Sequence, residues 1–366
     1  MMKWGPGVGM SLRGSFFWTF AVFVVVIACL LVYVRFVRIP KNVAYVSEED
    51  GGIVVINLNT LQVVKRIHPK DTAPRGIGVT YDGKFLVTAN KDTADASVFD
   101  TRGLRFIRRI PVGDNPEFVK LNPSGTSAFV SYEPGSTAGP PQEGPAGEQD
   151  DNADEPPAQI MEFNVRDWSR VQSFVAGKET EGLEFTPDGK SLIVANEARD
   201  SLGVYDVAAG KLTRTINLAS YGKRPRGVKV SPQGNSFAVT MEGSGTLLSL
   251  DQNLNVIRSV ATAAKPYGVA FDRQGRRIFV NAAAARKMQV YSADSLQLLG
   301  ETPIGQRCWH FTFTPDDSKL LLACGRSNNI YVIDAKTYRP IRVLDGFHLP
   351  WGIVTYPRAY GSLGLP

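Results

Sequence analysis

The sequence predicts an all-β fold of seven similar units, preceded by one apolar helix. Apolar and polar residues alternate along many short segments, which is the pattern of strands bounded by turns. A short motif recurs about every forty residues. Glycine (35 residues) and proline (23 residues) are frequent in this chain of 366, so turns are common. Four strands in a unit of this length are typical of one blade of a β-propeller.

A tripeptide opens each unit. The seven tripeptides occupy residues 74–76, 116–118, 180–182, 225–227, 266–268, 308–310 and 350–352. Measured between their middle residues, the spacings are 42, 64, 45, 41, 42 and 42 residues. Seven openings at this period predict seven blades, and the spacing of 64 indicates an insertion in the third blade.

Each unit follows the same order of strands and turns. In the unit that opens at 74–76, alternating residues end at the turn Tyr81-Asp82-Gly83, a second run covers Phe85–Ala89, and a third ends at Asp100. Val63–Ile67 is an example of a fourth run. Apolar and polar residues that alternate with a period of two between turns predict four antiparallel strands in each blade.

The two ends of the repeat region complement each other. The segment Val43–Ser47 corresponds to the second strand of a blade, whereas Trp351–Tyr356 corresponds to a first strand with no second strand after it. We therefore expect the C-terminal strand to close the first blade, because this pairing leaves no exposed strand edge. The propeller then covers 43–357, and 358–366 form a C-terminal tail.

The insertion covers 133–158, between the second and third strands of the third blade. It carries seven acidic residues, no basic residue and no apolar periodicity. Such a segment cannot bury a core of its own and is expected to be disordered. Two interpretations are open: a passive surface loop, or an electrostatic lid that shields the basic side of the channel mouth from anions.

The N-terminal region predicts a membrane anchor. From Ser15 to Val34 about twenty residues carry no charge, which is the length that crosses a bilayer as a helix. We assign 1–14 to a cytoplasmic N-terminus and 15–37 to the transmembrane anchor. The residues before Cys29 resemble a bacterial lipobox, so an acylated Cys29 is an alternative. Basic residues flank both ends of the segment and do not settle its orientation.

Charge and composition exclude several classes of function. The formal net charge is +6, to which residues 1–41 contribute +5 and the insertion −7. The remaining positive surplus has no runs of lysine and arginine that would follow a phosphate backbone, so nucleic acid is not an expected partner. Three cysteines and three histidines are too few for a zinc ribbon, an iron–sulfur cluster or a disulfide-dense scaffold.

The loops before the innermost strands should place a ring of side chains around one mouth of the central channel. This ring comprises Arg75, Glu117, Glu181, Arg226, Tyr267, Trp309, His310 and Trp351. Arginine binds carboxylates and tryptophan offers a stacking surface, which predicts a site for an anion or a cofactor. In the alternative, the arginines pair with the glutamates and the tryptophans pack between blades. Deeper in the channel we expect Lys120, Glu184, Lys229 and Thr312.

Two further features lie in the last complete unit. His310 occupies a position that is glycine in five other units and Phe118 in the sixth, which raises the alternative of a haem or metal ligand, although a lone histidine favours a hydrogen-bonded polar residue. Cys308 and Cys324 bracket a strand hairpin, so they could form a disulfide in an oxidising compartment or stay reduced. The sequence offers no evident Ser-His-Asp or metal-hydrolase constellation.

The repeats resemble the YVTN family of β-propellers, in the segments Tyr45-Val46-Ser47 and Phe279-Val280-Asn281 and in strands such as Ile330–Asp334. Residues 305–316 and 349–352 resemble β-propeller proteins associated with pyrroloquinoline quinone (PQQ)-dependent alcohol catabolism in bacteria. The resemblance implies a periplasmic propeller, and with it the orientation of the anchor. It implies no catalytic residue and names no cofactor.

We therefore expect a single-pass protein of the bacterial inner membrane with its propeller in the periplasm. It would act as a non-enzymatic binding or assembly module for a protein partner or a small anionic ligand, in PQQ-dependent or respiratory metabolism. The alternative is a cofactor-maturation factor or an enzyme that acts on a haem-like or lactone substrate at the channel mouth. Its candidate groups are His310, Arg75 and Glu181.

Overall fold

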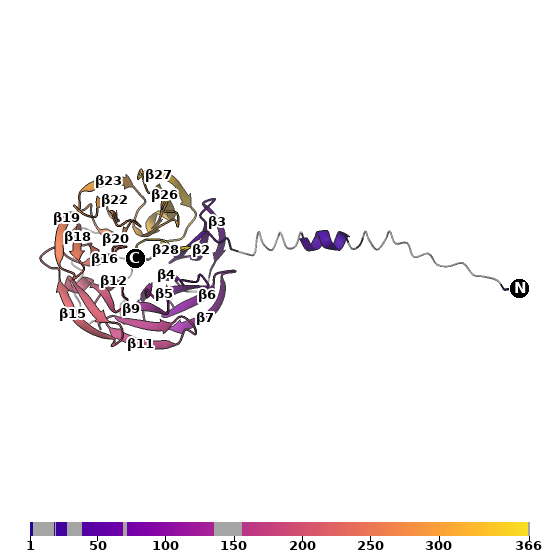
Figure 1. Cartoon of the computed structure of the whole chain (residues 1–366), viewed down its shortest axis with the longest axis horizontal. Coiled ribbons are helices and arrows are strands. Elements are labelled where there is room, and N and C mark those ends of the chain that lie inside the picture. The colour runs from indigo at the N-terminus through magenta and orange to yellow at the C-terminus, as the bar shows by residue number, and fades with distance from the viewer. Residues whose placement is uncertain (3–17, 19, 28–38, 69–71, 135–155, 365–366) are drawn as a thin grey trace.

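The structure is a computed structural model that describes residues 1–2, 18, 20–27, 39–68, 72–134 and 156–364. In this part of the chain, strands β1 to β28 form seven four-stranded antiparallel sheets. Figure 1 shows these sheets arranged as blades around a central axis. The predicted propeller of seven four-stranded blades is therefore confirmed.

The first four blades contain the following strands, from the innermost to the outermost. Blade 1 consists of β28 (Pro350–Tyr356), β1 (Val43–Glu48), β2 (Gly52–Asn57) and β3 (Gln62–Ile67). Blade 2 consists of β4 (Pro74–Val79), β5 (Phe85–Asn90), β6 (Asp95–Asp100) and β7 (Arg105–Pro111). Blade 3 consists of β8 (Pro116–Leu121), β9 (Ser127–Tyr132), β10 (Gln159–Asn164) and β11 (Arg170–Val175). Blade 4 consists of β12 (Thr180–Phe185), β13 (Ser191–Asn196), β14 (Ser201–Asp206) and β15 (Lys211–Asn217).

The last three blades follow the same order. Blade 5 consists of β16 (Pro225–Val230), β17 (Ser236–Met241), β18 (Thr246–Asp251) and β19 (Val256–Ala261). Blade 6 consists of β20 (Pro266–Phe271), β21 (Arg277–Ala282), β22 (Lys287–Ser292) and β23 (Leu298–Pro303). Blade 7 consists of β24 (Cys308–Phe313), β25 (Lys319–Cys324), β26 (Asn329–Asp334) and β27 (Pro340–Asp345). Two short 3-10 helices, η2 (Glu197–Arg199) and η3 (Gly325–Ser327), follow the second strands of blades 4 and 7.

Burial decreases from the axis outward. The inner strand β4 is buried throughout, whereas the outer strand β7 is exposed at every residue but Ile110. Inner strands pack their apolar side chains against the next blade: Phe129 of blade 3 meets Phe185 of blade 4 with ring centroids 5.0 Å apart. Burial of such pairs between blades supplies the core.

The ring closes as the sequence predicts. Strand β28 pairs antiparallel with β1, and Val354 lies opposite Tyr45. The last strand of the chain is thus the innermost strand of the first blade, and both sides of β1 are hydrogen-bonded.

The inner strands crowd one another near the face at which they begin, which we call the upper face. A Cβ atom on Gly182, the third residue of its motif, would lie 2.4 Å from the carbonyl oxygen of Arg226 in the next blade. Glycine avoids this clash in five blades. In blades 3 and 7 this position holds Phe118 and His310, whose rings meet edge to face at 5.7 Å. These two side chains therefore narrow the channel below its upper mouth.

The tail lies inside the channel, which the sequence did not predict. Gly361 pairs with Thr312 on the inner edge of β24, and the N–H of Phe313 donates to the carbonyl of Tyr360 at 2.8 Å. Leu363 is 9% exposed and packs among the inner residues of the ring. Since β28 ends at the opposite, lower face, residues 358–364 enter the channel from that face. Figure 1 shows the C-terminal end near the centre of the ring.

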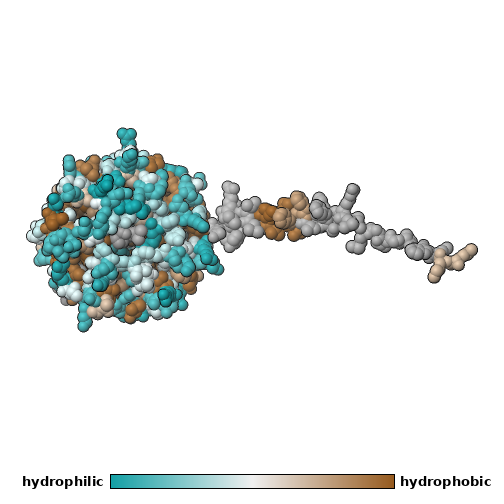
Figure 2. Space-filling view, viewed as in Figure 1, coloured by the Kyte–Doolittle hydropathy of each residue, from teal (hydrophilic) through white to brown (hydrophobic). Residues whose placement is uncertain are grey.

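Little of the predicted anchor is described. Residues 20–27 are helical and apolar, and their exposed side chains appear brown in Figure 2. Within the described ranges, no helix has the length and apolar character needed to cross a membrane. Most of 15–37, including Cys29, lies outside those ranges, so the anchor and its lipid alternative stay predictions.

The insertion has the predicted place between β9 and β10. Its first residue, Glu133, lies at the upper mouth, where the amide of Asn115 donates to its carboxylate at 3.3 Å. Residues 135–155 are outside the described part of the chain, so the choice between a passive loop and a lid stays open.

Candidate functional site

Buried ion pairs form the upper mouth of the channel. The guanidinium of Arg75, in blade 2, lies 2.7 Å from a carboxylate oxygen of Glu117 in blade 3 and 2.9 Å from one of Glu49 in blade 1. All three side chains are buried. This is the arrangement of the second sequence interpretation, in which the charges of the ring pair with one another.

Arg226 is the centre of a second and larger group. Its Nη1 atom lies 2.9 Å from Glu181, 2.9 Å from Glu197 and 3.2 Å from Glu242. Its guanidinium also lies 4.3 Å from the ring centroid of Tyr267 and donates to the Tyr267 hydroxyl at 2.8 Å. Burial opposes the charge of Arg226, but the carboxylates, Glu181 first, hold the pKa of this group well above its usual value.

The carboxylates of the mouth outnumber the arginines that neutralise them. Burial raises the pKa of Glu133 to about 8, with a further contribution from Glu117. Burial likewise raises the pKa of Glu197 to about 7, and that of Glu181 well above its usual value, although Arg226 opposes both shifts. At neutral pH these groups can therefore hold or release protons, which is the property that general acids and bases need.

Several polar atoms at the mouth have no hydrogen-bond partner within the described residues. On the acceptor side they are Glu117 Oε2, Glu133 Oε1 and Glu181 Oε2. On the donor side they are Nε of Arg75 and Nε of Arg226. Because buried polar groups are normally paired, these atoms indicate a place where a polar ligand can bind.

His310 lies just below this ring, in a cage of aromatic side chains. Its imidazole is 4.4 Å from Trp351, 5.4 Å from Tyr267 and 5.7 Å from Phe118, measured between ring centroids. Nδ1 lies 3.0 Å from the hydroxyl of Ser362 in the tail, whereas Nε2 has no partner within the described residues. Burial, with a contribution from Arg226, lowers the pKa of His310 well below its usual value. The imidazole is therefore neutral, and its Nε2 atom is free to accept a hydrogen bond.

One cavity connects these groups. Its lining includes Phe118, Arg226, Tyr267, His310 and the tail residue Leu363. The cavity lies between the charged ring and the tail, so it is closed from below by this chain's own residues. His310, Arg226 and Tyr267, three members of the predicted ring, are thus brought to one space.

The two tryptophans of the predicted ring mainly pack against neighbouring residues. The indole of Trp309 packs against Gly325, where a Cβ atom would lie 1.7 Å from the ring. Trp351 contacts Phe118 and His310 but does not line the cavity. A role of the ring in ligand binding stays a prediction. Within the described ranges, no group of three or more His, Cys, Asp or Glu side chains is placed to hold a metal ion.

The deeper residues also meet as expected. Glu184 lies 2.8 Å from the ammonium of Lys120 and 2.6 Å from that of Lys229, so three neighbouring blades contribute one Lys-Glu-Lys group. Both lysines donate to the carbonyl of Gly364 in the tail, at 3.3 and 3.0 Å. Thr312 contacts the tail as well.

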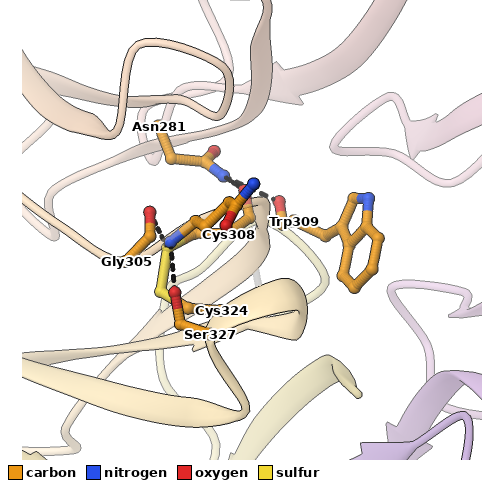
Figure 3. Close-up of a disulfide and its surroundings, with 7 residues drawn as sticks. Asn281, Gly305, Cys308, Trp309, Cys324 and Ser327 are labelled. Carbon is orange, nitrogen blue, oxygen red and sulfur yellow. Dashed lines mark hydrogen bonds between the residues drawn. A yellow bond between two sulfur atoms is a disulfide. The ribbon is translucent and has the colours of Figure 1, made fainter. Parts of the chain in front are cut away.

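A disulfide joins Cys308 to Cys324 beside the site (Figure 3). The two cysteines lie directly opposite each other because a β-bulge between Cys308 and His310 adjusts the register. The amide of Asn281 donates to the carbonyls of Cys308 and Trp309. The start of β24, which carries His310, is therefore held from two sides.

Sequence analysis missed a second ring of charged residues, which comes from the position immediately after the second strand of each blade. This position holds Glu49, Lys91, Glu133, Glu197, Glu242, Ala283 and Gly325 in blades 1 to 7. Four of the seven are glutamates, and all four lie at the upper mouth. Comparison of equivalent positions across the seven units could have found this signal. The tail residues Ser362 and Leu363 had no comparable signal.

Comparisons with known proteins agree with this architecture. A family model described as "Lactonase, 7-bladed beta-propeller" matches residues 166–270, which contain Glu181, Glu197, Arg226 and Tyr267. A search of curated proteins found no match. The chain is thus a seven-bladed β-propeller whose central segment is lactonase-like.

Solved structures share the fold at low sequence identity. A functionally unknown protein from Desulfotomaculum acetoxidans is 13% identical, with a TM-score of 0.72 over 86% of this chain and 98% of that chain. The periplasmic gluconolactonase of Pseudomonas aeruginosa is 17% identical, with a TM-score of 0.69 over 86% and 99%. The dihydro-heme d1 dehydrogenase NirN is 14% identical, with a TM-score of 0.62 over 87% and 76%. These likenesses establish the fold alone, and the finer resemblance to YVTN and PQQ-associated propellers stays a prediction.

Proposed function

We propose that this protein is an enzyme that hydrolyses a polyhydroxylated lactone at the upper mouth of the channel. The observation that carries the proposal is the set of unpaired polar atoms around Arg226 and His310. A sugar lactone offers hydroxyl groups as donors to the free carboxylate oxygens and a carbonyl as an acceptor for the free arginine Nε–H groups. The ligand would satisfy the groups that the protein leaves unpaired.

The geometry suggests a role for each group. The neutral His310 accepts at Nε2 a proton from the water that attacks the lactone carbonyl. Arg226 donates from Nε to the oxygen on which negative charge develops. Burial favours the protonated form of Glu181, and in this form Glu181 gives its proton to the ring oxygen as the carbon–oxygen bond breaks. The product is the open hydroxy acid, and the acid and base then exchange their protons through water.

The family match supports an enzyme over the binding module that was the first expectation. The match to a lactonase family covers the two blades that supply Glu181 and Arg226. A purely structural ring would explain the ion pairs, but it would not explain why two residues with unpaired atoms, Arg226 and His310, line one cavity.

A haem-type substrate is the second candidate, because the unpaired Nε2 of His310 could bind iron. The rings of Phe118, Tyr267 and Trp351 surround the imidazole, with centroids 4.4 to 5.7 Å from its own, so a macrocycle bound to Nε2 would have to displace some of them. A lactone is smaller than a macrocycle and needs no bond to Nε2. Titration with haemin distinguishes the two: a shifted visible absorption band that is lost in His310→Ala would favour the haem.

The lactone proposal is tested by the rate of δ-gluconolactone hydrolysis. A pH-stat measures the acid that is released, and the rate is compared with that of spontaneous hydrolysis. We expect acceleration by the wild type and a loss of about a hundredfold in His310→Ala, which is typical for removal of a general base. His348→Ala is the matched control, because His348 is exposed and lies outside the cavity. Equal rates in His310→Ala and the wild type would exclude the mechanism.

We further propose that the propeller lies outside the cytoplasm. The disulfide supports this, because disulfides persist in oxidising compartments, and the apolar helical residues 20–27 support a membrane tether. Protease added to spheroplasts should digest the propeller. Complete protection of the propeller while the membrane is intact would show that it lies on the cytoplasmic side.

A further inference from the structure

A second cavity lies in the lower part of the channel, on the other side of the tail. Lys120 and Leu363 line this lower cavity as well as the upper one, and Thr355, Arg358 and Gly364 complete its polar side. Among the described residues of its lining, the two charged ones, Lys120 and Arg358, are both cationic, and none carries a carboxylate. The lower cavity therefore differs in charge from the acidic upper mouth.

The lysines beside the lower cavity carry more positive charge than their partners among the described residues neutralise. Lys120 is 6% exposed and shares the single carboxylate of Glu184 with Lys229. The only other partner recorded for both ammonium groups in the described residues is the uncharged carbonyl of Gly364. A buried surplus of charge is costly unless an ion of opposite sign compensates it. In agreement, burial lowers the pKa of Lys120 to about 7, with Glu184 opposing and Lys229 reinforcing the shift.

Two further donors in the lower cavity have no hydrogen-bond partner in the part of the chain that the structure describes. The guanidinium of Arg358 lies over the ring of Tyr81, 3.6 Å from its centroid, and this stacking fixes its plane. Nη1 of Arg358 is buried and has no hydrogen-bond partner within the described residues. Thr355 is 2% exposed, and its hydroxyl is also unpaired within those residues. An ammonium, a guanidinium and a hydroxyl thus line one space.

We propose that the lower cavity binds a small oxyanion between Arg358, Lys120 and Thr355. The oxygens of such an anion accept hydrogen bonds from all three donors and neutralise the surplus charge. The bound anion would connect the tail, which supplies Arg358, to β8 and β28, which supply Lys120 and Thr355. The proposal is independent of the lactonase function, because it uses none of the groups assigned to hydrolysis.

The test measures the melting temperature of the full chain against low-millimolar sulfate or acetate, at constant ionic strength maintained with chloride. We expect a saturable rise of about 2 °C with at least one of the two oxyanions. Arg358→Gln should abolish the rise. Arg273→Gln is the matched control, because Arg273 also lies over an aromatic ring of the tail, that of Tyr360 at 5.5 Å, but does not line the lower cavity.

Two further results decide the matter. Thr355→Val, which keeps the shape of the side chain and removes the hydroxyl, should weaken the apparent affinity about tenfold without loss of folding. Crystals soaked in selenate should show anomalous density between Arg358 and Lys120. The proposal is overturned if the rise is equally large in Arg358→Gln, or if it is linear in salt and the same for all anions, which is a general solvent effect.

Discussion

The imidazole of His310, on the innermost strand of blade 7, contacts a hydroxyl that comes from the C-terminal tail: Nδ1 lies 3.0 Å from Ser362 Oγ. The same hydroxyl accepts the N–H of Phe311 at 3.0 Å. The tail therefore determines which nitrogen of His310 faces the upper cavity. This contact makes Ser362 a positioning residue for the proposed hydrolysis.

Ser362→Ala should lower the rate of δ-gluconolactone hydrolysis about tenfold or more through kcat, with little change in KM, because the imidazole loses its fixed orientation. The free energy of unfolding should fall by less than about 2 kcal/mol. Steady-state kinetics over a range of pH provide the measurement, with Ser362→Thr as the control that keeps the hydroxyl. An alanine variant with the wild-type kcat and pH profile would refute the role.

Truncation after Phe347 removes the closing strand β28 and should abolish cooperative unfolding, because the inner edge of β1 is then exposed. Truncation after Tyr356 removes only the tail and is the matched control. We expect it to keep a single thermal transition at a lower temperature. Calorimetry of both proteins is the measurement, and an unchanged transition in the shorter protein would contradict the closure.

The double variant Cys308→Ser/Cys324→Ser should lower the free energy of unfolding by about 3 kcal/mol, the value expected for a disulfide that closes a short loop. Chemical denaturation with and without a reductant measures this. The wild type unfolded under reducing conditions should approach the stability of the double variant. Equal stabilities of the oxidised wild type and the variant would show that the bond does not form in solution.

Glu133→Gln should flatten the dependence of stability on pH. The unfolded chain releases the proton of Glu133 near pH 4.5, whereas the folded protein keeps it up to about pH 8. Between these values the folded state binds more protons, so the free energy of unfolding falls as the pH rises. Glutamine cannot lose a proton, so the variant should match the wild type near pH 5.

At pH 8 the same variant should melt about 3 °C above the wild type. The measurement is the difference in melting temperature between the variant and the wild type from pH 5 to pH 8. Lys120 makes stability rise with pH above pH 7, but it does so in both proteins, so its contribution cancels in the difference. Glu301→Gln is the control, since hydrogen bonds from Lys287 hold the pKa of Glu301 below its usual value. Parallel curves for Glu133→Gln and the wild type would contradict the shifted pKa.

The sequence predicts the blades well, because turns and period-two alternation are local signals that repeat seven times. The closing strand could also be assigned, since Val43–Ser47 lacked a partner and Trp351–Tyr356 supplied one. The pairing of Cys308 with Cys324 could only be offered as one of two outcomes. This pairing depends on a β-bulge that shifts the register by one residue, and no residue type in the sequence predicts that bulge.

The contents of the channel could not be predicted. The contacts of Ser362 and Gly364 join residues that are far apart in the sequence, and the tail has neither periodicity nor a motif. The space it occupies depends on how closely the inner strands approach one another, which is a property of the whole ring. Glu197 and Glu242 were missed for a different reason: their shared position becomes visible only when the seven units are aligned on their second strands.

Ring closure and channel filling come from one continuous piece of chain, because β28 leads directly into the tail. During synthesis, residues 350–364 therefore emerge after every other described strand, when blade 1 still lacks its inner strand and the channel is open at its centre. Only at that last step does His310 contact the hydroxyl of Ser362, and only then does Lys120 donate to the carbonyl of Gly364. A chain released before residue 350 would have six complete blades and no finished site, so the proposed activity would depend on this last described segment.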